Sequence, residues 1–233
     1  MKNEVFRNRR LGPMKRLRPF GAAACCSALL TAISLSIIAP GWSWGRSFPA
    51  SGKVVFVCDG DTVILESGER VRYLGVDAPE VAHERTEADC FGMEAKKANS
   101  DMVLHQQVSL KYEREAVDPH GRLLAYVNLP DGRCANLEMV RAGCALVYRS
   151  SKDFGRIEEF LLLQREAIFK HKGMWGACSV KPAEAYMGNK RSFVFHRPDC
   201  AKGRKTAVRE RVSFADRWAA LEKGFRPCRF CKP

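Results

Sequence analysis

The sequence predicts an α+β protein that is mainly β, followed by a small basic module at the C-terminus. Three observations lead to this fold class. Short β-prone runs separated by turn residues occupy the middle of the chain, and stretches with helical periodicity lie between and after them. Residues 179–233 have a charge and cysteine pattern of their own. A chain of 233 residues can hold one ordinary domain and one small one.

Five segments have the composition of strands. They are 62–65, 71–74, 107–112, 123–129 and 145–148. The first two are joined by Ser67-Gly68-Glu69, which is typical of a hairpin turn. Pro130-Asp131-Gly132 marks another turn directly after the fourth segment.

Four segments are predicted to be helical. They are 94–105, 137–142, 158–171 and 217–223. We expect Asn136 to cap the N-terminus of the second helix and Gly143 to end it. In the last segment Asp216 is the expected N-cap.

Charged residues gather where the first hairpin should lie. Asp61 precedes its first strand, Asp77 follows its second strand, and Arg72 lies within the second strand. A hairpin of this size would bring the two aspartates together, and facing carboxylates form a site for a hard cation such as Ca²⁺ or Mg²⁺. The alternative interpretation is that Asp59-Gly60-Asp61 is an ordinary polar turn and Arg72 an exposed strand residue.

These groups fit the hydrolysis of a phosphodiester bond. Attack of water on phosphorus builds negative charge on the phosphoryl oxygens, which a divalent cation and fixed arginines can stabilise. Arg72 suits this role because a guanidinium stays protonated and donates two parallel hydrogen bonds to phosphate. Glu80 follows Pro79 on a loop from which it could orient or deprotonate the attacking water.

Three sequence blocks resemble the signature blocks of the staphylococcal nuclease (thermonuclease) family. They are Asp59-Gly60-Asp61-Thr62, Arg72 with Asp77-Ala78-Pro79-Glu80, and Asp118-Pro119-His120-Gly121-Arg122. The blocks occur in the family's order, and the similarity covers residues 52–178. It implies a five-stranded OB-type barrel with packed helices.

The resemblance also implies roles for individual residues. Asp61, Asp77 and the main-chain carbonyl of Ala78 would bind Ca²⁺. Arg72 and Arg122 would contact the scissile phosphate, and Glu80 would act on the attacking water.

Two further positions bear on substrate contacts in this resemblance. His120 stands where family members commonly carry Tyr, and Tyr148 would correspond to a family tyrosine that packs on the substrate base. Ala78 stands where Thr is frequent, which matters little if only the main-chain carbonyl is a ligand.

The C-terminal module carries a second pattern of metal ligands. His196 and Cys200 are four residues apart, and Cys228 and Cys231 form a C-x-x-C pair. Sulfur and imidazole ligands at such spacings suit tetrahedral Zn²⁺, which would also supply folding energy to a small core. The pattern resembles the metal-binding module of the adaptive-response alkylation repair protein, with His where that module has Cys. A disulfide among the three cysteines, or no bond at all, are the alternatives.

The cysteines between the two ends of the chain do not reveal their pairing. Cys58, Cys90, Cys134, Cys144 and Cys178 are an odd number, so at least one stays unpaired within a monomer if the module binds metal.

Residues 1–45 have the pattern of a targeting segment. Seven Lys and Arg residues precede an uncharged apolar run over 20–39. The length of this run lies between those of a cleavable signal peptide and a membrane-spanning helix, so both interpretations remain open. In either case we expect the enzyme outside the cytoplasm: periplasmic, extracellular, or anchored by an N-terminal transmembrane helix. Residues 46–51 and 179–189 are the expected linkers to a nuclease-like domain (52–178) and a metal-binding module (190–233).

The net charge of +13 is concentrated at the two ends of the chain. Residues 46–178 carry eighteen basic and twenty acidic residues, whereas residues 179–233 carry fourteen basic and five acidic. We therefore expect the module to hold nucleic acid through salt-dependent phosphate contacts while the preceding domain cuts it. A solvated basic surface that aids solubility is the alternative.

Taken together, the residues and the resemblance predict an exported, Ca²⁺-dependent phosphodiesterase, a thermonuclease-like endonuclease acting on DNA and, as a second candidate substrate, RNA. We expect a monomer and infer no protein partner. The alternative is a catalytically silent nuclease-like fold that only binds nucleic acid. The enzyme is favoured because Asp61, Arg72, Asp77, Glu80 and Arg122 are all present.

Overall fold

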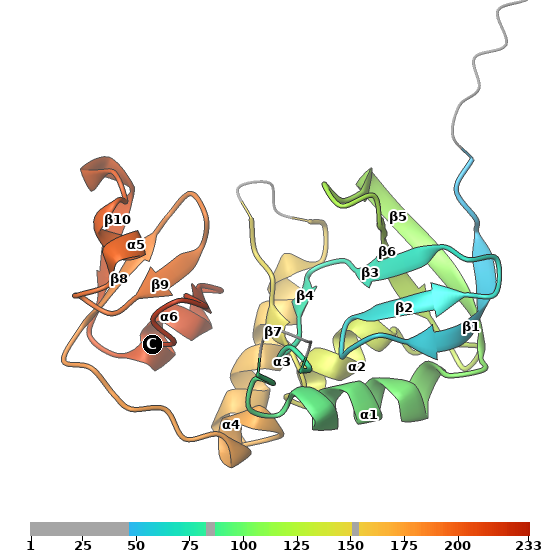
Figure 1. Cartoon of the computed structure of the whole chain (residues 1–233), viewed down its shortest axis with the longest axis horizontal. Coiled ribbons are helices and arrows are strands. Elements are labelled where there is room, and N and C mark those ends of the chain that lie inside the picture. Colours follow the sequence, from blue (N-terminus) through green and yellow to red (C-terminus); the bar gives the residue numbers. More distant parts are fainter. Residues whose placement is uncertain (1–46, 83–86, 151–153) are drawn as a thin grey trace, which may run out of the picture. The chain divides into compact units, whose positions relative to one another are not determined.

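The computed structural model describes residues 47–82, 87–150 and 154–233 (Figure 1). The predicted targeting segment, 1–45, lies outside the described residues. In the described part of the chain no helix is long and apolar enough to cross a membrane.

Five strands close into a barrel: β1 (Ser51–Val57), β2 (Thr62–Leu65), β3 (Arg70–Tyr73), β5 (Gln107–Val117) and β6 (Leu123–Asn128). Their order around the barrel is β1-β2-β3-β6-β5. All neighbouring pairs are antiparallel except β3 and β6, which run parallel. The expected five-stranded barrel is therefore confirmed.

One strand of the barrel differs from the sequence prediction. Segment 145–148 contains β7 (Leu146–Val147), which pairs with β4 (Val76–Asp77) in a separate two-stranded sheet and does not join the barrel. The fifth barrel strand is instead β1. Its register shifts between Val54 and Phe56, and this irregularity leaves Phe56 half-exposed and interrupts the alternation by which a strand is recognised.

Three longer helices, α1 (Gly92–Val103), α2 (Ala135–Arg141) and α3 (Ile157–Phe169), lie where helices were predicted, and the short α4 (Met174–Ala177) follows α3. Apolar side chains of α1, α2 and α3, including Val103, Met139 and Phe160, share one buried core with the barrel strands. The helices α1 and α2 each begin two residues earlier than the sequence patterns indicated.

Asn136 does not cap α2, contrary to the sequence prediction. It lies inside the helix, and Cys134 is the N-cap residue. The fully buried Asn136 amide accepts from Val127 N at 2.9 Å and donates to the carbonyls of Leu74 at 2.9 Å and Ala125 at 3.1 Å. These bonds connect α2 to β6 and to the segment before β4. They also satisfy the donor and acceptor of a buried amide.

The C-terminal part of the chain forms a four-stranded sheet in the order β10-β8-β9-β11. The strands are β8 (Tyr186–Asn189), β9 (Val194–His196), β10 (Arg211–Phe214) and β11 (Arg226–Pro227), and α5 (Ala201–Arg204), a 3₁₀ turn η1 (Val208–Glu210) and α6 (Arg217–Glu222) connect them. The predicted cap of α6 is confirmed, because Asp216 Oδ1 accepts from Ala219 N at 2.8 Å.

Strand β8 begins at Tyr186, inside the segment 179–189 that we expected to be a linker. The linker is shorter than predicted because the buried Tyr186 ring packs against Phe195, with centroids 5.6 Å apart.

A disulfide joins Cys90 to Cys178 across 88 residues of sequence. Cys90 lies two residues before α1, in the segment that follows Glu80, and Cys178 ends α4. The other cysteines in the described part of the chain are free thiols, including Cys58, Cys134 and Cys144. The bond therefore fastens the start of α1 to the end of the helical layer.

Removing this disulfide should lower the free energy of unfolding by about 2–4 kcal/mol, because a cross-link over a long loop restricts the unfolded chain. Urea denaturation of Cys90→Ser and Cys178→Ser against the wild type measures the effect. The matched control is Cys58→Ser, which replaces a free, half-buried thiol and should keep the wild-type midpoint. Equal midpoints for the wild type and Cys90→Ser would contradict the assignment.

Candidate functional site

Two buried aspartates converge on one arginine. Asp61 ends the turn between β1 and β2, Asp77 lies in β4, and their exposed fractions are 3% and 5%. The Nη1 atom of Arg72, in β3, pairs with Asp61 Oδ1, and its Nη2 atom lies 3.1 Å from Asp77 Oδ1. The carboxylates thus come together from separate β segments, as the hairpin led us to expect.

Local hydrogen bonds hold the Asp61 carboxylate in place. Its Oδ1 accepts from Thr62 Oγ1 at 2.9 Å, and its Oδ2 accepts from the main-chain N–H of Ala78 at 2.6 Å. Gly60 makes this approach possible, since a Cβ there would lie 2.6 Å from the Cβ of Ala78 and 3.0 Å from that of Ala95. The Asp-Gly-Asp sequence is therefore a tightly packed turn that α1 presses against the Asp77 segment.

A polar pair beneath the site was not predicted from the sequence. Asn99 of α1, fully buried, donates to the carbonyl of Asp59 at 3.0 Å and accepts from Tyr73 Oη at 2.8 Å. Burial raises the pKa of Tyr73 far above its usual range, so the hydroxyl stays protonated and remains a donor. The pair links α1 to the turn before Asp61 and to the strand that carries Arg72. A lone Asn on the apolar face of a helix was the available signal.

Arg122 lies directly before β6, the strand that runs parallel to the strand of Arg72. Burial lowers the pKa of Arg72. The charge of Asp77 raises this pKa, while Arg122 is near enough to lower it further. The Nε of Arg122 itself pairs with Asp118 Oδ2 at 2.7 Å. Burial would raise the pKa of Asp118, but hydrogen bonds from Arg122 and from the main chain of His120 lower it below its usual value. In this structure Arg122 is thus held beside Arg72 by Asp118 rather than by Asp61 or Asp77.

Glu80 lies in the loop after β4, with 38% of its side chain exposed. Two bonds to Asp89 fix its backbone: its N–H donates to Oδ2 at 3.3 Å and its carbonyl accepts from Asp89 N at 2.9 Å. The Oε1 atom pairs with Nη1 of Arg229, which comes from the C-terminal module. The Nη2 atom of Arg229 also donates to Asp77 Oδ1 at 2.8 Å.

The two predicted substrate-contact residues lie in different settings. Tyr148 is 38% exposed, and the guanidinium of Arg226 lies 4.7 Å from its ring centroid. Because Arg226 Nη1 is also 3.9 Å from Asp77 Oδ2, Tyr148 borders the carboxylates. His120 is exposed in the turn before Arg122, and its N–H donates to Asp118 Oδ1 at 2.8 Å.

The donor set around Arg72 suits a hard divalent cation. The two buried carboxylates, Asp61 and Asp77, have oxygen donors of the kind that Ca²⁺ prefers, and the main chain of Ala78 runs between them. Buried carboxylates require compensating charges or hydrogen-bond donors. Among the residues described here, arginines and a main-chain N–H group provide them.

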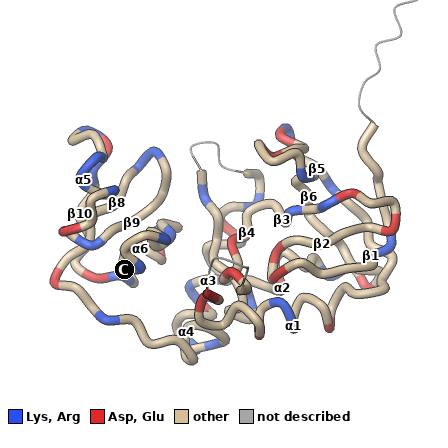
Figure 2. Tube along the Cα trace, in the orientation of Figure 1, with Lys and Arg blue, Asp and Glu red and all other residues tan. Residues whose placement is uncertain are grey.

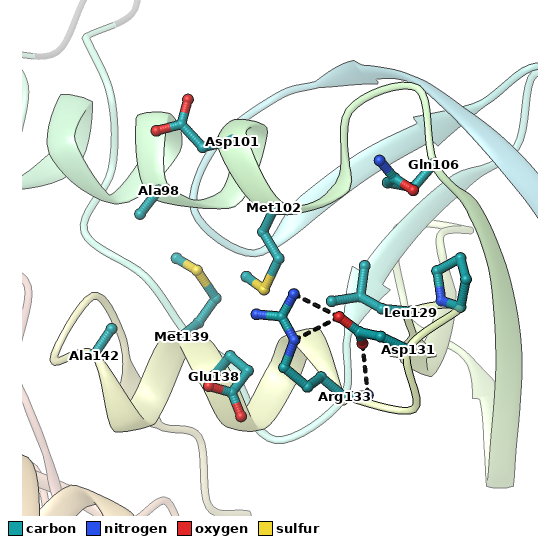
Figure 3. A pocket seen from close by; sticks show the side chains of 11 residues that line it. Ala98, Asp101, Met102, Gln106, Leu129, Asp131, Arg133, Glu138, Met139 and Ala142 are labelled. Atoms are coloured by element: carbon teal, nitrogen blue, oxygen red, sulfur yellow. Dashed lines mark hydrogen bonds and ion pairs between the residues drawn. The ribbon is translucent and has the colours of Figure 1, made fainter.

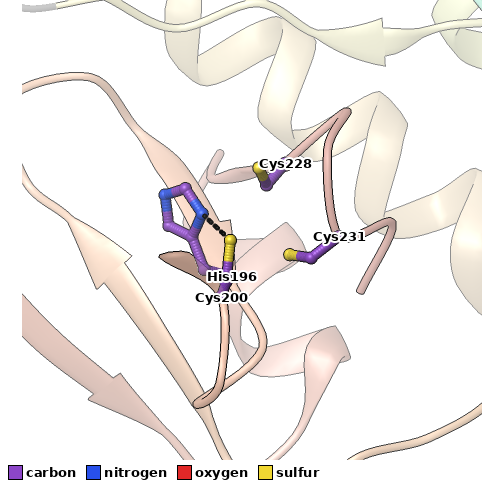
Figure 4. A group of neighbouring side chains, drawn as sticks. All are labelled: His196, Cys200, Cys228 and Cys231. Carbon is purple, nitrogen blue, oxygen red and sulfur yellow. Dashed lines mark hydrogen bonds between the residues drawn. The ribbon is translucent and has the colours of Figure 1, made fainter. Parts of the chain in front are cut away.

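The four predicted zinc ligands form a compact cluster. The ligand atoms of His196, Cys200, Cys228 and Cys231 all lie within 4.8 Å of one another, and Figure 4 shows the side chains pointing toward a common centre. All three cysteines are free thiols in the structure, which favours the zinc site over the disulfide alternative. Burial lowers the pKa of His196 and so favours the neutral imidazole that a metal requires. The cluster could therefore bind zinc.

Basic residues are spread along the C-terminal strands and helices (Figure 2). Four of them are exposed on α5 and the turn that follows: Lys202, Arg204, Lys205 and Arg209. Others face acidic groups of the preceding part of the chain, since Arg229 pairs with Asp77 and Lys232 Nζ lies 2.9 Å from Asp89 Oδ1.

A groove of about 540 Å³ lies between α1, α2 and the turn after β6 (Figure 3). Within it the Nη2 and Nε atoms of Arg133 both pair with Asp131 Oδ2 of the same turn, at 2.7 and 2.8 Å. The residues that line the groove do not include any member of the carboxylate cluster. The groove is therefore separate from the predicted site.

Comparison with known proteins gives two family matches. The family described as staphylococcal nuclease homologue matches residues 70–177, and the metal binding domain of Ada matches residues 181–233. The thermonuclease of Staphylococcus intermedius is 34% identical over 126 residues, which are 51% of this chain and 72% of that protein. The thermonuclease of Staphylococcus hyicus is 30% identical over 126 residues, 53% of this chain and 74% of that protein. Endonuclease YncB of Bacillus subtilis is 32% identical over 122 residues, 50% of this chain and 57% of that protein.

The His/Cys cluster should bind about one zinc ion per chain, because its four ligands match a tetrahedral site. Elemental analysis of the purified protein measures the zinc content. Cys231→Ser removes one ligand and should release the metal, whereas Cys58→Ser replaces a free thiol outside the cluster and should retain it. Zinc that stays bound to Cys231→Ser as tightly as to the wild type would contradict this ligand set.

Proposed function

The chain belongs to the staphylococcal nuclease family, and from this premise we propose that it is an exported, Ca²⁺-dependent nuclease that hydrolyses phosphodiester bonds. DNA is the proposed substrate, with RNA as a second candidate. The observation that carries the proposal is the convergence of Asp61 and Asp77 on Arg72. Glu80 lies within the same group of charges, because Arg229 joins it to Asp77.

In the proposed mechanism Asp61, Asp77 and the carbonyl of Ala78 would hold the cation. Bound Ca²⁺ would stabilise negative charge on the phosphate and orient a water molecule. Arg72 donates to two phosphate oxygens from within the site, and Arg122 adds a second guanidinium from the turn directly before β6. Both arginines act where charge grows as the reaction proceeds, which is the arrangement that lowers a barrier.

Glu80 is the proposed group that acts on water. Its half-exposed carboxylate can accept a proton from the water whose oxygen bonds to phosphorus. As that bond forms, the ester P–O bond breaks and the leaving oxygen takes a proton from solvent. The backbone bonds to Asp89 hold Glu80 in the loop where this contact is possible.

The alternative is a protein of the same fold that binds nucleic acid without cutting it. Such a protein would gain no catalysis from two carboxylates buried beside an arginine, an arrangement whose desolvation cost is often not repaid by the ion pairs. Because Asp61, Arg72 and Asp77 are arranged in this way, the enzyme is the better-supported proposal.

Export is proposed on two grounds. The first is the basic and apolar N-terminal sequence, which lies outside the described residues. The second is the disulfide between Cys90 and Cys178, because disulfides persist in oxidising compartments such as the periplasm or the exterior.

Arg122→Ala should lower kcat by about 10²- to 10³-fold, the loss typical of one group that stabilises charge in the transition state. Arg72→Ala should lose at least as much. Cleavage of DNA is measured with and without added Ca²⁺, and the wild type should require the cation. The matched control is Arg133→Ala, because Arg133 is also held by an aspartate in a turn but lies outside the site. Full activity of Arg122→Ala, or of the wild type without Ca²⁺, would contradict the proposal.

The exposed basic residues of α5 and η1 are proposed to hold nucleic acid while the site cuts it. Replacing Lys202, Arg204, Lys205 and Arg209 by Gln should raise KM for duplex DNA. The slope of log KM against log salt concentration should also fall by about 0.9 for each lost phosphate contact. The control replaces Lys97 and Lys170, which are exposed and paired on α1 and just after α3. An unchanged salt slope would mean that this surface only aids solubility.

A further inference from the structure

Arg229 connects two sites that lie far apart in the sequence. It stands between Cys228 and Cys231 of the predicted zinc cluster, and its guanidinium bonds to Asp77 and Glu80 of the nuclease site. We propose that Arg229 is a third phosphate-binding arginine of the nuclease, supplied by the C-terminal module. This inference rests on the proposed nuclease function.

An apolar core fixes the module against the helices of the barrel part. Trp175 of α4 belongs to one buried cluster with Phe195, Phe214 and Leu221 of the module. Its ring also lies 6.2 Å from that of Trp218 on α6. Burial of large aromatic side chains contributes far more free energy than surface ion pairs do. This shared core therefore fixes the position of the module against the helices.

A buried glutamine connects the module to the strand pair that carries Asp77. Gln164 of α3 is 1% exposed; its Oε1 accepts from Val147 N at 2.7 Å and its Nε2 donates to the carbonyl of Leu221 at 2.7 Å. Val147 lies in β7 opposite Val76 of β4, directly before Asp77. The position of α6 is therefore coupled through one side chain to the position of a predicted cation ligand.

The turn that carries Arg229 is held at both ends. Cys228 N donates to the carbonyl of Phe195 at 2.9 Å, and Arg197 N donates to Cys231 Sγ at 3.4 Å. Beyond the turn Lys232 pairs with Asp89, the residue that fixes the backbone of Glu80. Zinc held by Cys228 and Cys231 would restrict the turn further, which lowers the entropy that Arg229 loses on binding a ligand.

Arg229 and Arg72 meet at the same oxygen atom. The Nη2 of Arg229 lies 2.8 Å, and the Nη2 of Arg72 3.1 Å, from Asp77 Oδ1. The side chain of Arg72 on β3 is 14% exposed, whereas that of Arg229 is 53% exposed and comes from the module. Two guanidinium groups, one from the barrel and one from the module, thus meet at a single carboxylate oxygen.

Arg229 shares a carboxylate partner with Arg72, because both guanidinium groups pair with Asp77. Arg72, for which the family resemblance implies a phosphate contact, pairs with Asp61 and Asp77 in the same way. A cation bound by Asp77 would share the charge of this carboxylate and so weaken its pairing with Arg229. The planar fork of Arg229 can then donate to the free oxygens of a bound phosphate, which match its geometry.

The test compares Arg229→Ala and Arg229→Lys with the wild type in the full chain. The first readout is binding of a cleavage-resistant, single-stranded phosphorothioate oligonucleotide in the presence of Ca²⁺, followed by fluorescence anisotropy at several salt concentrations. The second is kcat/KM for unmodified DNA. The matched control is Arg156→Ala, because Arg156 also makes two bonds to a carboxylate, at 2.7 and 2.9 Å, but to Glu159 on α3.

Arg229→Ala should weaken oligonucleotide binding and lower kcat/KM by about tenfold each, the loss expected when one charge-assisted contact disappears. The salt slope for the single strand should fall by about 0.7, since one phosphate contact is lost. Arg229→Lys should keep the salt slope and lose part of the affinity, because the charge remains without the fork. Arg156→Ala should match the wild type in both readouts.

Wild-type or stronger binding by Arg229→Ala, or an unchanged salt slope, would overturn the inference. A variant that cuts faster than the wild type would mean that Arg229 shuts the site instead of serving it. The binding measurement tests Arg229 without turnover, so the two proposals can fail separately. Wild-type protein that binds the oligonucleotide but does not cut unmodified DNA in the presence of Ca²⁺ would refute the proposed nuclease function.

Discussion

Two buried carboxylates, Asp61 and Asp77, face each other across the guanidinium of Arg72, and the rest of the structure depends on this arrangement. Taking two carboxylates out of water is costly unless cations and N–H groups compensate them. The chain provides this compensation with Arg72 from β3 and the N–H of Ala78. These groups meet only when the hairpin, β4 and α1 are all in place, so the fold and the site form together.

The support for this charge cluster extends well beyond the barrel. Hydrogen bonds from Tyr73 to Asn99, and from Asn99 to the carbonyl of Asp59, stabilise the turn before Asp61. Gln164 joins β7 to the C-terminal module. The module in turn places Arg226 and Arg229 around Asp77. The module, whose sequence indicates a metal site and a basic surface, thereby also contributes side chains to the proposed nuclease site.

The positions of the strands and helices were predictable where local patterns are regular. Segment 62–65 matches β2, and Asp216 caps α6 as its sequence context indicates. Prediction was wrong where tertiary contacts outweigh local preference. The irregular register of β1 hides its alternation, and Asn136 gains three buried hydrogen bonds inside α2 that outweigh a role as its cap.

The sequence by itself determined the chemical groups of both sites, because carboxylates, arginines and zinc ligands recur at spacings of a few residues that short-range geometry can interpret. It also indicated that Asp61 and Asp77 would meet, since one hairpin separates them. Only the tertiary structure decided that Arg229 reaches Asp77, across 152 residues of sequence. That contact is created by burial of Trp175, Phe214 and Leu221 in a shared core, and hydrophobic burial has no direction that a sequence pattern could reveal.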